Sequence, residues 1–114
     1  MRSVFFYTTA LGECPVRKFL DSLPGKDAQK VVWVLSLLEE FDVLPASYFK
    51  KLHGSEEIWE CRIQLGSAAY RVFCFFAGRA VVVLTHGLRK KAQKTPRREI
   101  ERAEDYRSDY LRRQ

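Results

Sequence analysis

Two arginines on neighbouring predicted strands are the residues best suited to chemistry in this sequence. Arg62 lies in the alternating segment 58–65, Arg71 lies in the segment 70–76, and Gly66-Ser67-Ala68 between them is a hairpin signal. In an antiparallel hairpin with this turn, the two guanidinium groups stand almost opposite each other. Like charges directly opposite on a sheet are destabilising, and an anion between them removes the repulsion. The pair therefore predicts a phosphate site.

A cluster of cations follows the last predicted strand. Residues 86–114 carry ten Lys/Arg and five Asp/Glu, which is +5 of the whole-chain net charge of +6. The cluster follows the apolar run 81–84, so a rigid element holds its charges in place. Arg89, Lys90 and Lys91 are expected at the rim of the sheet that carries the arginine pair. This pattern favours nucleic acid as the partner.

Structural, non-catalytic roles for these residues stay open. Either arginine can pair with Glu60 on a solvated face, where ion pairs contribute little. His86 can exchange protons near neutral pH, with a pKa lowered by nearby cations, or it can be a half-buried residue bonded to the turn at Gly87. His53 lies in a predicted loop. Two histidines more than thirty residues apart offer no metal-ligand set, so we expect neither a metal nor a cofactor.

The elements that position these residues follow from hydrophobic periodicity. A strand is predicted at 3–9, helices at 15–23 and 26–42, strands at 58–65, 70–76 and 80–85, and a helix at 96–112. The segment 43–56 is expected to be a loop that can include a short strand at 49–52. The expected fold class is α+β, with the order β-α-α-β-β-β-α.

Composition limits the possibilities further. The 114 residues are 46% hydrophobic and 13% aromatic, which indicates one packed domain over residues 1–114. Three cysteines without CxxC spacing are expected to be reduced core thiols. The apolar N-terminal stretch has no cleavage-site pattern, and no apolar run approaches the roughly 18 residues of a membrane span. We therefore expect a cytoplasmic protein with no membrane partner.

Five short motifs follow one another along the chain. They are Lys50-Lys51-Leu52-His53-Gly54, Ile58-Trp59-Glu60-Cys61-Arg62, Tyr70-Arg71-Val72-Phe73, His86-Gly87-Leu88-Arg89-Lys90-Lys91 and Thr95-Pro96. In this order the sequence resembles the RelE/HigB toxin superfamily, most closely its phage-derived HigB-like branch, over nearly the whole chain. The resemblance implies a RelE-like fold: a small, twisted, mainly antiparallel sheet with helices packed on one face and a basic concave face opposite.

The resemblance also implies a function. Such proteins are toxins of type II toxin–antitoxin systems that cleave mRNA on the ribosome and thereby inhibit translation. This mRNA interferase reaction is endoribonucleolytic and uses no metal: the ribose 2′-OH attacks the adjacent phosphate and leaves a 2′,3′-cyclic phosphate and a 5′-OH. The expected partners are mRNA, the ribosome and a cognate antitoxin with a helix-turn-helix. The alternative is a non-cleaving interaction protein, either a ParE-like gyrase poison or an RNA-binding module, because fold alone does not decide activity.

By position, the resemblance assigns Arg62, Arg71 and Lys91 to catalysis, with Arg71 holding the scissile phosphate. His86 joins them as a catalytic candidate. The expected RNA-binding residues are Lys50, Lys51, Arg89, Lys90 and Lys94. Positioned guanidinium groups supply the fixed charge that a pentavalent phosphate requires.

The general base is left open by the sequence. Position 97, near which better-known relatives carry a catalytic tyrosine, is an arginine. The candidates are therefore His86, Glu60 or a lysine of lowered pKa. Leu88 also stands where the family pattern carries an aromatic residue suited to stacking on a base.

Overall fold

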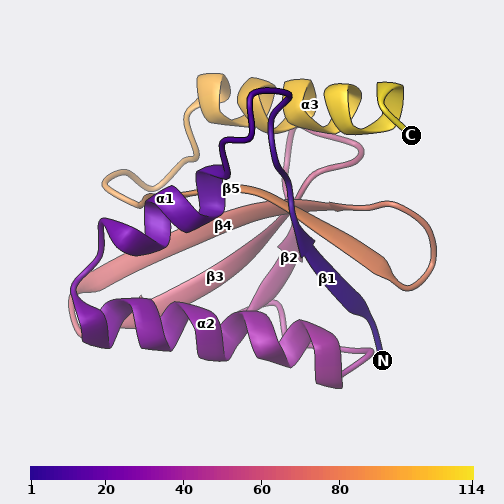
Figure 1. Cartoon of the computed structure of the whole chain (residues 1–114). Coiled ribbons are helices and arrows are strands. Elements are labelled where there is room, and N and C mark those ends of the chain that lie inside the picture. Colours follow the sequence, from indigo (N-terminus) through magenta and orange to yellow (C-terminus); the bar gives the residue numbers. More distant parts are fainter.

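Eight elements follow one another in the computed structural model, which describes residues 1–114 (Figure 1). They are β1 (Ser3–Phe6), α1 (Pro15–Asp21), α2 (Gly25–Glu40), β2 (Phe49–Lys51), β3 (Trp59–Leu65), β4 (Ala68–Phe76), β5 (Val81–Arg89) and α3 (Arg97–Arg112). The α+β class is confirmed. The short strand allowed at 49–52 is present as β2, although the predicted order left it out because a strand of three residues is too short to show a period in the sequence. None of the helices combines the length and apolar character needed to cross a bilayer.

The strands form one mixed sheet in the order β1-β5-β4-β3-β2. The β1–β5 pair is parallel and the other pairs are antiparallel. β3 and β4 are joined by two residues, and Gly66 there has φ +59, a conformation that costs glycine nothing. This turn sets the register that places Arg62 directly opposite Arg71, as the hairpin signal predicted.

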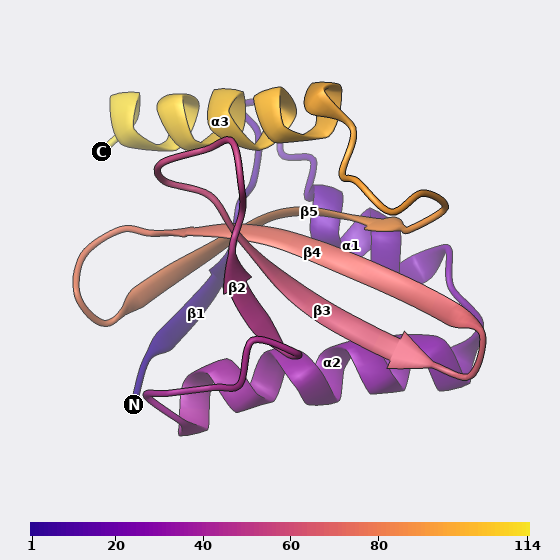
Figure 2. The same cartoon turned by 180° about the vertical axis from the view of Figure 1, so that it is seen from behind.

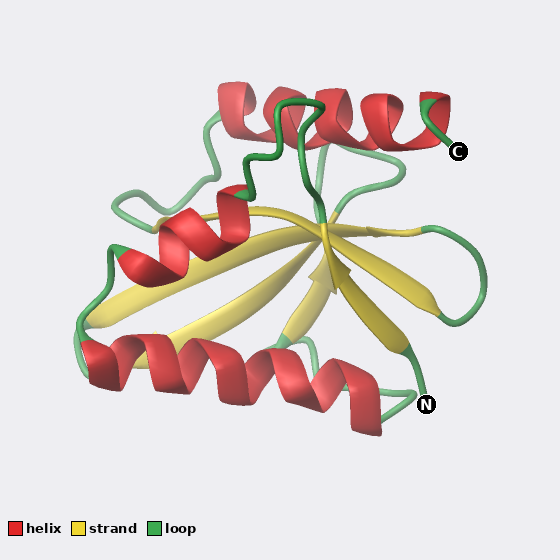
Figure 3. Ribbon diagram, viewed as in Figure 1, coloured by secondary structure: helices red, strands yellow, loops and turns green.

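The helices α1 and α2 cover one face of the sheet (Figure 3). Their apolar side chains pack against inward-facing residues of the central strands: Cys61, Ile63, Tyr70, Val72, Cys74, Val82 and Leu84. α1 approaches β5 very closely at Gly87. A Cβ atom at this position would lie only 2.4 Å from the ring of Phe19, so the contact requires a glycine.

The third helix lies on the opposite face, so the expectation that all helices pack on one face is wrong. Figure 1 shows α3 and α2 on opposite sides of the sheet. Ile100 and Ala103 of α3 pack in one cluster with Phe73, Phe75 and Leu52. The physical reason is that β4 carries large apolar residues on both faces, so both faces must be covered. Phe73 and Phe75 were the sequence signal for this arrangement.

A β-bulge in β5 changes which face its last residues occupy. Phe73 pairs with His86 and Cys74 pairs with Leu84, so Thr85 is the extra residue. Without the bulge, His86 would share the α1–α2 face with Leu84. The bulge turns it toward α3 instead.

Candidate nucleic-acid interface

A basic cleft lies on the α3 side of the sheet, between the β2–β3 edge, the loop 90–96 and the start of α3, elements that Figure 2 shows from behind. Its volume is about 350 Å³, and Glu60 is its only acidic lining residue. Six cationic residues line it: Lys50, Lys51, Arg62, Lys90, Lys94 and Arg97. A hollow with this excess of positive charge attracts phosphate. The structure thus brings Lys50, Lys51, Lys90 and Lys94, four of the five expected RNA-binding residues, into one place.

The arginine pair lies beside this cleft, with a carboxylate between the two side chains. Arg71 Nε lies 3.4 Å from Glu60 Oε1, and Arg62 Nε lies 4.0 Å from Glu60 Oε2. Arg71 also donates a hydrogen bond of 2.9 Å from Nη1 to the Tyr70 carbonyl. The like charges are therefore bridged by a protein carboxylate, which is the pairing with Glu60 that the sequence left open.

Arg71 is much less accessible than predicted. It was expected on an uncovered face, but only 7% of its surface is exposed, while the Arg62 side chain is 32% exposed. Burial lowers the pKa of Arg71, the neighbouring Arg62 lowers it further, and Glu60 opposes both. Both arginines border a second, smaller hollow of about 270 Å³.

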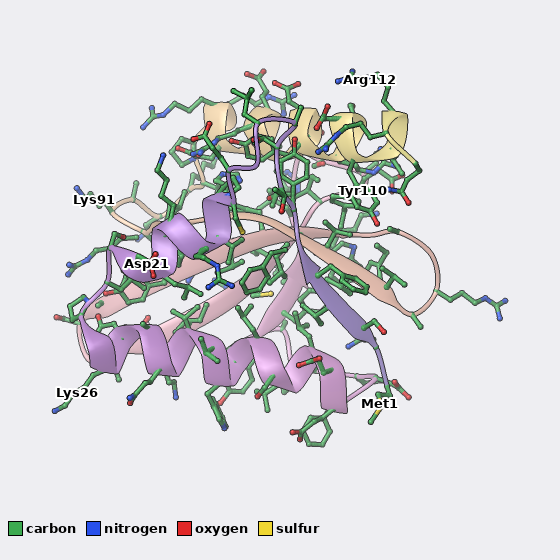
Figure 4. All side chains as sticks on the ribbon, in the orientation of Figure 1. Met1, Asp21, Lys26, Lys91, Tyr110 and Arg112 are labelled. Atoms are coloured by element: carbon green, nitrogen blue, oxygen red, sulfur yellow. The ribbon has the colours of Figure 1, made fainter.

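The loop after β5 directs Lys90, and not Lys91, toward the cleft. The Lys90 backbone N–H donates to the Ala69 carbonyl at 2.7 Å, which ties the start of the loop to β4. Burial lowers the pKa of Lys90, and Arg71 adds to the effect. Lys91 is exposed and does not line the cleft, and Figure 4 shows it pointing outward. Arg89 is also exposed and outside the cleft, since its cross-strand partner Tyr70 faces α1 and α2.

His86 does not reach this cleft. It is 1% exposed, beneath α3, and it borders a different hollow between α1 and α3. Its Nε2 lies 3.0 Å from a Glu99 carboxylate oxygen, and its Nδ1 lies 3.2 Å from Thr85 Oγ1. Burial is the main reason that its pKa falls to about 4. The imidazole is therefore neutral at pH 7, and because a carboxylate only accepts, its proton sits on Nε2.

Two features of the cleft were missed at the sequence level. Arg97 lines the cleft from the first turn of α3, and its Nη1 donates to the Gly54 carbonyl at 3.1 Å. His53 lines the same wall. The signal for both was their position next to basic motifs, Lys50-Lys51 and the segment after β5. No three His, Cys, Asp or Glu side chains lie close enough together to form a metal-ligand cluster.

Fold and cleft together define a class: a small α+β protein that presents a basic, phosphate-attracting cleft on one face of a mixed sheet. The chain belongs to the family described as Phage derived protein Gp49-like (DUF891), whose profile matches residues 18–108. This phage-derived family is RelE-like and toxin-like in general. No curated protein matches the chain.

Proposed function

We propose that this protein is the toxin of a type II toxin–antitoxin pair and acts as a ribosome-dependent mRNA endoribonuclease of the HigB-like kind. The ribose 2′-OH attacks the adjacent phosphate, and the products are a 2′,3′-cyclic phosphate and a 5′-OH. Membership of a toxin-like family supports the first part of this proposal. The second part depends on the chemistry of the cleft.

The observation that carries the nuclease proposal is the register of Arg62 opposite Arg71 at the margin of a cleft with six cationic side chains. Both guanidinium groups are held by strands, and Arg71 is further fixed by its bond to the Tyr70 carbonyl. Charges that are in place before the reaction stabilise a phosphorane-like transition state without reorganisation. Lys50, Lys51, Lys94 and Arg97 bind the RNA backbone on either side.

Two of the expected catalytic residues have other roles in this proposal. Lys90, which lines the cleft, replaces Lys91 as the lysine that faces the phosphate. His86 supports the fold beneath α3 and does not touch RNA. The cognate antitoxin, a helix-turn-helix protein, inhibits the toxin by covering the cleft, where a net positive charge fits an acidic segment.

The test uses ribosomes, a translated mRNA and the purified protein. New RNA ends with a 5′-OH should appear, and Arg62→Ala should reduce their rate of formation about 100-fold, because one fixed charge at the phosphate is lost. Arg79→Ala is the matched control, since Arg79 is exposed in the β4–β5 turn, and it should cleave like the wild type. Intact transcripts with the wild-type protein would refute the proposal. Inhibition of gyrase supercoiling by the same preparation would favour the ParE-like alternative.

A further inference from the structure

The one carboxylate in the basic cleft is incompletely satisfied. Glu60 is 7% exposed, and its Oε1 is buried without any hydrogen-bond partner. Arg71 Nε, 3.4 Å away, is also buried and makes no hydrogen bond. Two opposite charges therefore face each other without the aligned N–H···O geometry that a structural ion pair adopts. Buried polar groups are nearly always hydrogen-bonded, so each exception calls for a structural or functional explanation.

The position of Glu60 relative to the phosphate site is the second observation. Its Oε2 faces Arg62 at 4.0 Å, and Glu60 and Arg62 both line the cleft that is otherwise cationic. A phosphate that binds Arg62 in this cleft therefore lies beside the carboxylate, while Arg71 lies outside the cleft lining. No other acidic side chain lines the cleft, and His86 lies under α3 with both ring nitrogens occupied.

Building on the nuclease function proposed above, we propose that Glu60 is the general base of RNA cleavage and that Lys90 is the general acid. Glu60 accepts the proton of the 2′-OH while the O2′–P bond forms. The P–O5′ bond breaks, and the Lys90 ammonium gives its proton to the departing 5′ oxygen. Arg62, which lines the same cleft, holds the phosphate charge throughout. The products are the 2′,3′-cyclic phosphate and a 5′-OH end, and the net proton transfer runs from the 2′-OH to the 5′ oxygen.

The surroundings of Lys90 suit its part in this reaction. Its backbone is anchored to Ala69 at 2.7 Å, and its side chain lines the cleft that Glu60 lines. Burial and the charge of Arg71 lower its pKa, which makes the ammonium a more ready proton donor than an exposed lysine. Lys91, one residue further on, is exposed and outside the cleft.

As a general base, Glu60 affects RNA binding and RNA cleavage in opposite directions. A negative charge beside the phosphate site repels RNA, so removing it should tighten binding. The same removal takes away the acceptor for the 2′-OH proton. Glu60→Gln should therefore bind RNA more tightly and cleave it more slowly, whereas a variant that merely damages the fold loses both.

The experiment compares the wild type, Glu60→Gln, Glu60→Asp and the control Glu56→Gln, since Glu56 is exposed and lies outside the cleft. Single-turnover cleavage of mRNA on ribosomes gives the rate from pH 5 to 9. Binding is measured with a short RNA that carries a 2′-deoxy sugar at the cleavage position and cannot react. We expect Glu60→Gln to lose about 100-fold or more in rate, with unchanged or tighter binding. Glu60→Asp should keep part of the rate.

The possible outcomes separate the two proposals. If the wild type and Glu56→Gln cleave and Glu60→Gln cleaves equally well with the same pH profile, the general-base assignment is overturned and the nuclease function stands. The assignment also fails if the loss of cleavage in Glu60→Gln is fully accounted for by a loss of RNA binding. If no version cleaves translated mRNA, the nuclease function falls and the assignment falls with it.

Discussion

Replacing Arg71 by methionine should destabilise the protein strongly, and replacing Glu60 as well should restore most of the stability. The two residues are each 7% exposed and their charged atoms lie 3.4 Å apart. Arg71→Met leaves the Glu60 carboxylate buried without its nearest cation. Breaking a buried pair in this way costs about 3–5 kcal/mol. Arg62 still lies 4.0 Å from the other carboxylate oxygen and is partly solvated, so we expect the low end, about 3 kcal/mol.

In a domain of this size, that loss lowers the melting temperature by about 12 °C, at about 4 °C per kcal/mol. In the double variant Glu60→Met/Arg71→Met no charge is stranded, so its stability should lie within about 1 kcal/mol of the wild type. Urea unfolding of the wild type, both single variants and the double variant gives the coupling energy directly. Arg79→Met, in an exposed turn, should stay within about 0.5 kcal/mol of the wild type.

The reasoning fails if Arg71→Met unfolds at the wild-type midpoint, or if the double variant is less stable than Arg71→Met alone. A large loss of stability in Arg71→Met would also explain why Arg62→Ala, and not Arg71→Ala, is the cleaner functional test. Loss of cleavage in a half-unfolded Arg71 variant would say nothing about phosphate binding.

Two further predictions concern the packing around β5. Gly87→Ala places a methyl group 2.4 Å from an aromatic ring of α1 and should lower the free energy of unfolding by about 1–3 kcal/mol, measured with urea. Gly25→Ala, with open space around its Cβ, should be close to neutral. Equal unfolding midpoints for the two variants would contradict the close contact. His86 has a pKa of about 4 in the folded protein and an ordinary value of 6.5 in the unfolded chain. Its contribution to the free energy of unfolding is therefore fully present above about pH 6.5 and is lost as the pH falls toward 4, about 3 kcal/mol in all. His86→Gln should flatten the pH dependence of the unfolding free energy in this window, while His53→Gln, in an exposed loop, should not; parallel curves for His86→Gln and the wild type would show that another group titrates.

Much of the candidate site was expected from the sequence. Lys50, Lys51, Lys90 and Lys94 were expected at one basic surface and do line one cleft. The family resemblance gave this expectation; local spacing did not, because β2 and the end of β5 are separated in the sheet by β4 and β3. Arg89 and Lys91 lie outside the cleft because the course of a loop depends on hydrogen bonds such as that of Lys90 to Ala69, which leave no trace in the spacing of residues.

The accessibility of the charged residues was not predictable in the same way. Alternation along β3 and β4 places Arg62 and Arg71 on one face, but it does not say how deeply either is covered. That depends on α3, which crosses the face because Phe73 and Phe75 need to be buried there. Glu60 was expected as one possible partner of the arginines, and only the coordinates show it between them with an unsatisfied oxygen.

The sequence by itself determined most of the secondary elements, the hairpin register and the sign of the charge, because periodicity and turn chemistry act between residues close together in the chain. The tertiary structure alone decided which of these residues can meet a ligand. The bulge at Thr85 turns His86 under α3, and the loop after β5 brings Lys90 to the cleft in place of Lys91. Both results depend on contacts between segments far apart in the sequence, where burial and hydrogen bonding compete and no local pattern records the outcome.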